Sequence, residues 1–220
     1  MARIGLLGGS FNPAHRGHRR ISLAAIDALG LDEVWWLVSP GNPLKEGAKD
    51  MAPFAARLAS ARRMAARAPI RVSDFESRTG TRYTIDTLAA LTRRYPGNQF
   101  IWLMGSDTLP NFHQWRRWRD IARTVPIAVI RRPGYDHAAQ AARAMGWLRR
   151  FVRPSSQARQ WTGWSAPAII QLRLPPDPTS ATRLRAIDPN WHANALSRSS
   201  GPRRHGRPDE PRRKLARPSH

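Results

Sequence analysis

Short apolar runs recur along the chain at intervals typical of the strands of a sheet. The first run, residues 3–8 (RIGLLG), ends in glycines and predicts a strand that is buried on both faces. Continuous apolar runs of this kind are typical of parallel strands rather than of half-exposed antiparallel ones. Five further runs predict strands at residues 34–38, 70–73, 100–104, 126–130 and 168–174.

Stretches with helical spacing of apolar residues separate these runs. Between residues 17 and 29, Ile21, Ala25 and Leu29 recur every four positions, and Gly30 provides a stop. Strands that alternate with helices predict an α/β fold with a parallel sheet covered on both faces. The other predicted helices span residues 53–68, 84–94, 115–123 and 136–149.

The composition is that of a folded protein. Of the 220 residues, 41% are hydrophobic and 24% charged, which excludes wholesale disorder. The absence of cysteine excludes a disulfide scaffold, a thiolate zinc site and a cysteine nucleophile. No apolar run approaches the ~20 residues of a membrane-spanning helix, and the N-terminus has no secretory pattern. We therefore expect a cytoplasmic protein that does not enter a membrane.

The charge departs strongly from the average. Lys and Arg number 37 against 15 acidic residues, a formal net charge of +22. Residues 198–220 hold eight Lys or Arg and two acids, a net of +6, so 22 − 6 = +16 remains on the rest of the chain. Such a field attracts polyanions, whether nucleic acid, an acidic membrane surface or phosphorylated small molecules.

The richest chemistry follows the first predicted strand, in residues 8–18 (GGSFNPAHRGH). Gly8 and Gly9 let the backbone approach an anion closely, and the start of the next helix attracts phosphate. The segment is neither a Walker loop nor the dinucleotide G-x-G-x-x-G. His15 and His18 lie three apart, so we expect both imidazoles to share one helix face, where two donors would stabilise charge developing on a transferring phosphoryl group. A zinc site is less favoured because a third ligand is missing.

A second polar motif lies near the end of the predicted sheet, in residues 180–185 (SATRLR). Ser180 and Thr182 offer hydroxyl and N–H groups at a helix start, and Arg185 lies one turn further on. This combination suits the β- and γ-phosphates of a nucleotide. Taken alone, such a motif is more often an ordinary helix cap.

The two motifs together resemble the G-S-F-N-P-x-H-x-G-H and S/T-x-T-x-x-R signatures of the nucleotidyltransferase superfamily. Residues 82–88 (RYTIDTL) are similar to the S-Y-T-x-D-T-L of bacterial nicotinate-nucleotide adenylyltransferases, with Arg82 in place of Ser. Residues 105–118 (GSD, then FHQW and Trp118) and 131–135 (RRPGY) are also of that family's type. The resemblance covers residues 3–187. It implies a Rossmann-like doubly wound parallel sheet of nucleotidyltransferase type.

The resemblance implies adenylyl transfer from ATP to nicotinate mononucleotide, giving deamido-NAD and pyrophosphate in NAD biosynthesis. The substrate's own phosphate attacks, so catalysis is positioning plus charge stabilisation. The candidate catalytic residues are His15, His18, Lys45 and Arg185. Mg²⁺ is expected to bind mainly through the ATP phosphates, with no dedicated protein ligands. The expected partners are these two nucleotides, with no specific nucleic acid, and the expected state is a monomer or homodimer.

The family's binding residues carry over position by position. Trp115 is expected to stack on the pyridine ring, the backbone near Thr84 and Arg116 to hold the nicotinate carboxylate, and Asp107 to contact the ribose or adenine region. The implied ATP contacts are Gly8, Gly9, Ser10, Phe11, His18, Gly105, Asp107, Ser180, Thr182 and Arg185. The implied nicotinate-nucleotide contacts are Asn12, Lys45, Tyr83, Thr84, Trp115, Arg116 and Arg132.

The sequence departs from the family pattern in two places. Lys45 follows a leucine where the family often has histidine, and the chain beyond Arg185 lacks the usual apolar helical segment. We therefore expect a nucleotidyltransferase domain at residues 1–187 and a basic, disordered tail at 188–220. Three alternatives stay open: another phosphomonoester substrate such as phosphopantetheine, an inactive homologue, or a basic protein that binds nucleic acid through cationic grooves and stacking rings.

Overall fold

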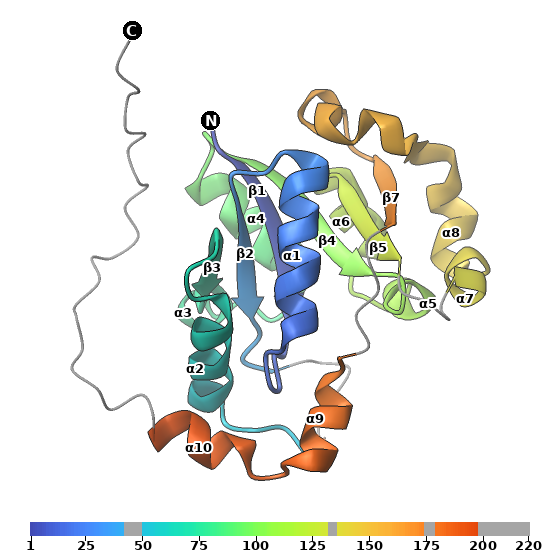
Figure 1. Ribbon diagram of the computed structural model, residues 1–220. Helices are drawn as coiled ribbons and strands as arrows, with labels where there is room; N and C mark the ends of the chain where they lie inside the picture. The colour runs from blue at the N-terminus through green and yellow to red at the C-terminus, as the bar shows by residue number, and fades with distance from the viewer. Residues whose placement is uncertain (42–49, 132–135, 174–178, 198–220) are drawn as a thin grey trace, which may run out of the picture.

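The computed structural model describes residues 1–41, 50–131, 136–173 and 179–197. Within these residues, seven parallel strands form one sheet in the order β3-β2-β1-β4-β5-β7-β6 (Figure 1). The predicted doubly wound α/β class is therefore confirmed. The strands are β1 (Arg3–Gly9), β2 (Glu33–Val38), β3 (Ile70–Ser73), β4 (Gln99–Gly105), β5 (Ile127–Arg131), β6 (Val152–Arg153) and β7 (Ile169–Arg173).

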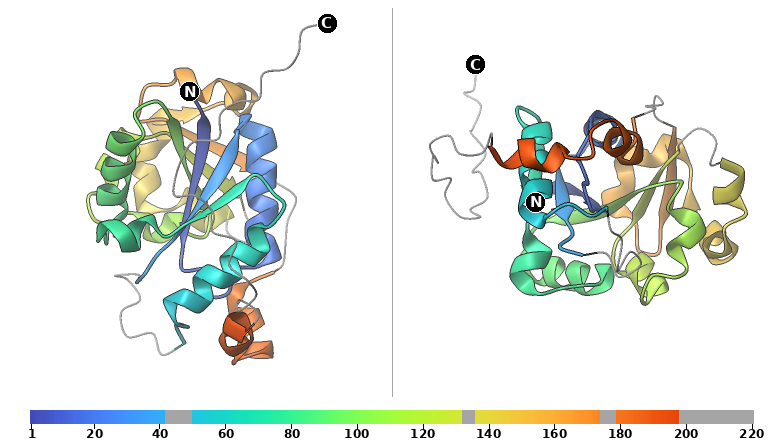
Figure 2. Two further views of the ribbon diagram at one scale, coloured as in Figure 1. Left: turned by 90° about the vertical axis from the view of Figure 1, so that its left-hand side faces the viewer. Right: turned by 90° about the horizontal axis from the view of Figure 1, so that it is seen from below.

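Helices cover both faces of this sheet (Figure 2). On one face lie α1 (Arg16–Leu29), α2 (Phe54–Ala65) and the 3-10 segment η3 (Ser155–Gly163). On the other face lie α3 (Phe75–Thr79), α4 (Thr84–Arg94), α5 (Leu109–Phe112), α6 (Trp118–Thr124), α7 (Asp136–Gln140) and α8 (Arg143–Leu148), the last followed by the 3-10 turn η2 (Arg149–Phe151).

The strands are apolar throughout because successive side chains enter two different cores. In β2, Trp35 and Leu37 pack under the α4 face, whereas Trp36 packs under α1 and α2. The same alternation separates Trp102 from Leu103 in β4. Trp35, Trp36 and Trp102 are 4%, 0% and 2% exposed, so these tryptophans are core residues, as their place in strand runs predicts.

Three predicted helices differ from the observed ones. The helix predicted at 53–68 ends at Ala65, and Arg67 has a left-handed φ of 58°. The helix predicted at 136–149 is split into α7 and α8, and the one predicted from 115 begins only at Trp118, after Arg117 with φ of 52°. Backbone turns of this kind depend on packing partners and leave no periodic signal in the sequence.

The predicted tail needs a correction. Within 188–220, α10 (Trp191–Ser197) is a helix that packs on α2, and Ala195 is only 1% exposed. Arg63 on α2 donates from Nη1 to the Ala195 carbonyl at 2.8 Å. The segment is too short and polar to fold alone, and α2 supplies the surface that stabilises it. Residues 198–220 lie outside the described residues.

The chain order of the strands places the functional loops. From β1 the chain proceeds to β2 and β3 on one side, and β4 then pairs with β1 on the other side. The strand order therefore reverses between β1 and β4, where open α/β sheets bind ligands at the carboxyl ends of their strands. The loops after Gly9 and Gly105 meet at this edge. In the described part of the chain, no helix is long and apolar enough to cross a membrane.

Candidate active site

The loop between β1 and α1 is held by close packing on both sides. A Cβ on Gly8 would lie 2.6 Å from the Trp102 ring, so this position accepts only glycine without a shift. Phe11 is 1% exposed, has a left-handed φ of 48°, and stacks on Trp36 at 5.0 Å between ring centroids. Packing on the two cores therefore holds Gly8 and Phe11 in place, and Ser10 between them is partly exposed.

The two histidines lie together, as their spacing predicts. Their ring centroids are 3.8 Å apart at the start of α1, where His15 is the N-cap. The His15 backbone N–H donates to Nδ1 of His18 at 3.1 Å. That bond leaves the proton of a neutral His18 on Nε2, which makes Nε2 a donor. His15 is 4% exposed whereas His18 is half-buried, so His18 is the more accessible of the two.

Arg185 reaches the same loop from the other end of the chain. Its Nη1 donates to the Asn12 carbonyl at 2.7 Å, and its Nη2 pairs with Asp50 at 2.7 Å. The Asn12 side chain in turn donates to the Asp50 carbonyl at 2.8 Å and accepts from the Ala52 N–H at 3.2 Å. The fold thus joins the two sequence motifs directly. The Asn12 amide bonds to backbone here, and its contact with a nucleotide stays a prediction.

The start of α9 (Ala181–Ile187) lies beside the start of α1 (Figure 1). A Cβ on Gly17 would lie 3.3 Å from the Thr179 carbonyl oxygen, so the small residue permits this approach. Ser180 caps α9, and its Oγ accepts from the Arg183 N–H at 3.2 Å. The cap explains why serine is needed locally, and the exposed Thr182 stands in the first turn of the helix.

Aromatic residues build the neighbouring part of the site, after the carboxyl end of β4 and at the start of α4. Trp115 contacts Trp102 and Phe112 edge-to-face, with centroids 6.2 and 5.4 Å away. The Arg116 guanidinium lies 4.6 Å from the ring centroid of Tyr83, the N-cap of α4. Three predicted nicotinate-nucleotide contacts therefore lie close in space, and Thr84 opens α4 beside them.

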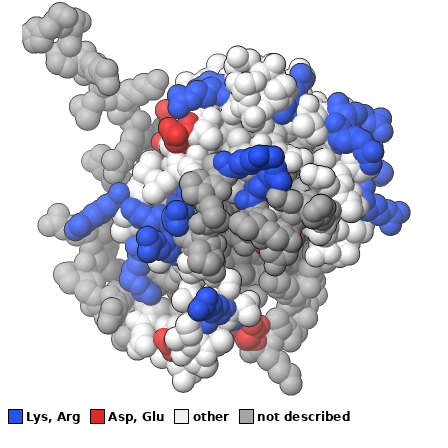
Figure 3. All heavy atoms as spheres, turned by 45° about the vertical axis from the view of Figure 1, so that its right-hand side comes forward, with Lys and Arg blue, Asp and Glu red and all other residues white. Residues whose placement is uncertain are grey.

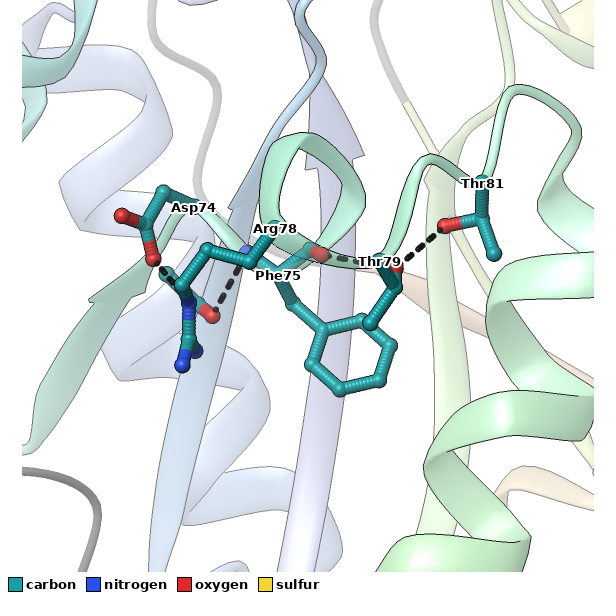
Figure 4. Close-up of polar contacts among 6 residues, drawn as sticks. Asp74, Phe75, Arg78, Thr79 and Thr81 are labelled. Carbon is teal, nitrogen blue, oxygen red and sulfur yellow. Dashed lines mark hydrogen bonds and ion pairs between the residues drawn. The ribbon is translucent and has the colours of Figure 1, made fainter.

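Hydroxyl groups hold the segment that leads to Tyr83 (Figure 4). Thr79 donates to the Phe75 carbonyl at 2.8 Å and bonds Thr81 at 3.0 Å. Thr87 on α4 bonds both Thr81 at 3.1 Å and the carboxylate of Glu76 at 3.3 Å. In the same view, Arg78 pairs with Asp74 on the outer side of α3.

Glu76 is a buried carboxyl group at 8% exposure. Burial raises its pKa to about 7, although hydrogen bonds from Thr87 and Ser39 favour the charged form and act in the opposite direction. Glu76, Asp50 and the buried Arg57 were not predicted from the sequence as part of the site. Each acts through contacts with distant segments, so no local pattern distinguishes them from surface charges.

The remaining predicted residues lie in the turn that ends β4 or outside the described residues. Gly105 ends β4 and accepts from the Thr108 N–H at 3.0 Å, while Asp107 lies half-buried in the same turn. Lys45 and Arg132 lie outside the described residues. Among the residues that the structure describes, no group of three or more His, Cys, Asp or Glu side chains could hold a metal ion.

Basic side chains are spread over the surface of the molecule (Figure 3). Figure 3 shows Lys and Arg in several separate groups over one face, with few acidic side chains between them. Some guanidinium groups pack on rings: Arg119 lies 4.7 Å from the Trp118 ring centroid, and Arg123 lies 5.4 Å from that of Trp147. The positive surface potential attracts anionic ligands in general, whereas the loops at the carboxyl ends of the strands offer a defined place for one to bind.

Known proteins are similar to this chain over most of its length. The chain matches the Cytidylyltransferase-like family over residues 6–187. A protein of Erythrobacter litoralis named "Probable nicotinate-nucleotide adenylyltransferase" is 60% identical over 189 residues, which cover 86% of each chain. A protein of Parvibaculum lavamentivorans with the same name is 52% identical over 183 residues, 83% of this chain and 90% of the relative.

Solved structures share the fold at low sequence identity. The nicotinic acid mononucleotide adenylyltransferase of Plasmodium falciparum, complexed with NaAD, superposes with a TM-score of 0.64 at 14% identity. The match covers 90% of this chain and 96% of that one. The same enzyme complexed with APC gives a TM-score of 0.62 over 91% and 97% of the two chains. The predicted fold is thus confirmed by an independent set of coordinates.

Proposed function

We propose that this chain, which belongs to the Cytidylyltransferase-like family, transfers the adenylyl group of ATP to nicotinate mononucleotide and releases pyrophosphate. The relatives at 60% and 52% identity bear the corresponding name, so the family resemblance extends to the enzyme class. The observation that carries the proposal is the meeting of His15, His18 and Arg185 at the loop after β1. Deamido-NAD is the second product, which places the reaction in NAD biosynthesis, and we expect the reaction to take place in the cytoplasm.

The chemistry needs no covalent enzyme intermediate. A phosphate oxygen of nicotinate mononucleotide attacks the α-phosphorus of ATP, a new P–O bond forms, and the bond to the β-phosphate oxygen breaks. Negative charge grows on the oxygens in transfer and on the departing pyrophosphate. The Nε2–H of His18, the first N–H groups of α1 and the guanidinium of Arg185 would stabilise that charge; their common location at the loop after β1 supports this role.

Other predicted contacts complete the ATP side of the proposal. Gly8, Gly9, Ser10 and Phe11 bring backbone N–H groups to the phosphates, and Ser180 and Thr182 approach from α9. Gly105 and Asp107 lie at the end of β4, where the adenosine would bind. Lys45 remains a proposed phosphate contact. Mg²⁺, bound mainly through the ATP phosphates, would neutralise part of their charge.

The nicotinate nucleotide would bind against the aromatic residues. Trp115 offers a ring for stacking on the pyridine, and Tyr83 and Arg116, which contact each other, lie in the same region. The backbone near Thr84 and Arg116 would bind the carboxylate, which distinguishes nicotinate from its amide. Asn12 and Arg132 are the remaining proposed contacts.

A pyrophosphate-release assay with ATP and Mg²⁺ tests the proposal. The substrate panel is nicotinate mononucleotide, nicotinamide mononucleotide and phosphopantetheine. We expect release above background with the first, and less with the other two. A stronger response to phosphopantetheine would reassign the acceptor, and no release with any substrate would identify an inactive homologue.

A further inference from the structure

Arg57 is a buried cation on α2, directly beneath the loops after β1 and β2. It is 1% exposed and lies between two buried apolar neighbours, Ala56 and Leu58. A guanidinium at such a position is costly unless its N–H groups are bonded. In this fold the guanidinium N–H groups of Arg57 donate hydrogen bonds, and the groups that accept them indicate the role of the side chain.

Within the described residues, the four acceptors of Arg57 are backbone carbonyl oxygens. Nη1 donates to Ser10 at 2.8 Å and to Ser39 at 2.7 Å. Nη2 donates to Pro40 at 2.9 Å, and Nε to Ala52 at 3.0 Å. One side chain therefore joins the loop after β1, the loop after β2 and the segment that precedes α2.

The bond to Ser10 fixes the direction of the next amide. In a planar trans peptide the C=O and N–H point in opposite directions. The Ser10 carbonyl points at Arg57, so the N–H of Phe11 points away from it. No group in the described part of the chain accepts a hydrogen bond from that N–H. The left-handed φ of 48° at Phe11 is uncommon for a bulky residue and needs such an external restraint.

Arg57 also carries a positive charge, and the described residues around it offer no counter-charge. Among the described residues no carboxylate pairs with it, and burial alone accounts for the lowering of its pKa. A positive charge in a poorly solvated place acts over a longer range than one on the surface. An anion on the far side of the Ser10–Phe11 peptide would be attracted by the Arg57 charge in addition to the dipole of the Phe11 N–H.

We propose that Arg57 is a positioning residue for phosphate binding: through the Ser10 carbonyl it directs the Phe11 N–H toward the ATP phosphates. This inference rests on the proposed function, because it assigns ATP to the loop after β1. It adds a residue from outside both sequence motifs. Arg57 itself touches no substrate and acts through the peptide that it holds.

The test compares Arg57→Lys with Arg62→Lys, an exposed arginine on the same helix. Lysine keeps the charge but lacks the planar set of donors that bonds several carbonyls at once. Inorganic pyrophosphate and adenosine are titrated separately by calorimetry. In Arg57→Lys we expect pyrophosphate affinity to fall at least ~10-fold with adenosine affinity unchanged, and single-turnover transfer at saturating ATP to fall ~10²-fold, the scale of an ångström of misplacement. Arg62→Lys should match the wild type in all three measurements.

A second measurement uses the wild type and does not depend on whether Arg57→Lys folds. The chain has six phenylalanines, so ¹⁵N-phenylalanine labelling of the wild type gives a short list of amide signals, and Phe11→Leu assigns one of them. We expect pyrophosphate to shift the Phe11 amide strongly downfield.

An unshifted Phe11 amide with bound pyrophosphate, or equal losses of adenosine and pyrophosphate affinity in Arg57→Lys, would overturn the positioning role. Both results leave the proposed transfer reaction standing if the wild type still releases pyrophosphate from ATP and nicotinate mononucleotide. A wild type that neither binds pyrophosphate nor turns over would instead remove the proposed function and this inference with it.

Discussion

The two halves of the candidate site are built in different ways. The half around the loop after β1 is held by directional polar contacts: Arg57 to Ser10, Arg185 to Asn12 and Asp50, and the His15 N–H to His18. The half at the end of β4 is held by aromatic packing. There Trp115 meets its neighbours edge-to-face and the Arg116 guanidinium lies over the Tyr83 ring, while side-chain hydrogen bonds such as Thr87 to Thr81 hold only the segment that leads to Tyr83.

The difference follows from what each half would recognise. Phosphate oxygens take hydrogen bonds at defined angles, so donors must be fixed to within a fraction of an ångström. A pyridine ring offers a flat apolar face, and a positioned indole binds it without directional bonds. Substitutions in the polar half should therefore reduce turnover, whereas substitutions in the aromatic half should lower the binding affinity for one substrate.

His18→Ala should reduce turnover by at least ~10²-fold, the scale of losing one preorganised donor in the transition state. The nicotinate nucleotide should still bind, because the aromatic half is intact. Circular dichroism checks the fold, single-turnover kinetics the rate, and calorimetry the binding. His192→Ala on α10 is the matched control and should leave the rate unchanged. Near-normal turnover in a folded His18→Ala protein would contradict the catalytic role.

Trp115→Ala should weaken nicotinate-nucleotide binding by removing a stacking contribution of roughly 1–3 kcal/mol. That corresponds to a ~5- to 150-fold rise in the dissociation constant. Binding of a non-hydrolysable ATP analogue should change little, and preference for the carboxylate over the amide should persist. Trp115→Phe should retain part of the affinity.

Calorimetric titration of each ligand against both Trp115 variants and the wild type measures these effects. If Trp115→Ala weakens the ATP analogue and spares the nicotinate nucleotide, the two halves have been assigned the wrong way round.

Glu76→Gln should change the pH dependence of stability with a smaller effect on activity. Burial raises the pKa of Glu76 from 4.5 to about 7, so between these values the folded protein holds a proton that the unfolded chain has lost. The free energy of unfolding of the wild type should therefore fall as pH rises through this window, by up to about 3 kcal/mol. The amide has no charge to bury and should remove that slope.

Thermal unfolding at pH 5 and pH 8 measures the effect. The Glu76→Gln midpoint should exceed that of the wild type at pH 8 by several degrees. Asp74→Asn, an exchange at the exposed pair with Arg78, serves as control. Parallel pH profiles for wild type and Glu76→Gln would show that Glu76 is charged throughout.

Removing residues 198–220 should have the smallest effect on either half. The segment is nearly free of apolar residues, so transfer rate and thermal midpoint should be retained. Non-specific binding to a polyanion such as heparin should weaken, because eight cationic side chains are lost. A chain ending after residue 190 also loses α10, and its midpoint should fall, since Ala195 and the bond from Arg63 are lost.

Much of the fold was predictable because its signals are local. The predicted strands agree with β1 to β5 and β7 within a residue at each described end, since buried parallel strands are continuous apolar runs. The edge strand β6 was not predicted. It has two exposed residues and exists only because β7 supplies a bonding partner. For the same reason the sequence did not predict α10, because this short helix is stabilised by its packing on α2.

The sequence by itself determined the family, the α/β class, the pairing of His15 with His18 and the residues of both motifs. These features depend on the order and spacing of residues within single segments, where the local chain geometry sets the distance between neighbouring side chains. Only the tertiary structure decided that Arg185 meets Asn12, that Glu76 is buried with a raised pKa, and that Arg57 bonds Ser10. Each of those contacts joins segments that strand order brings together, and burial changes the energy of a charge only after the surrounding chain has folded.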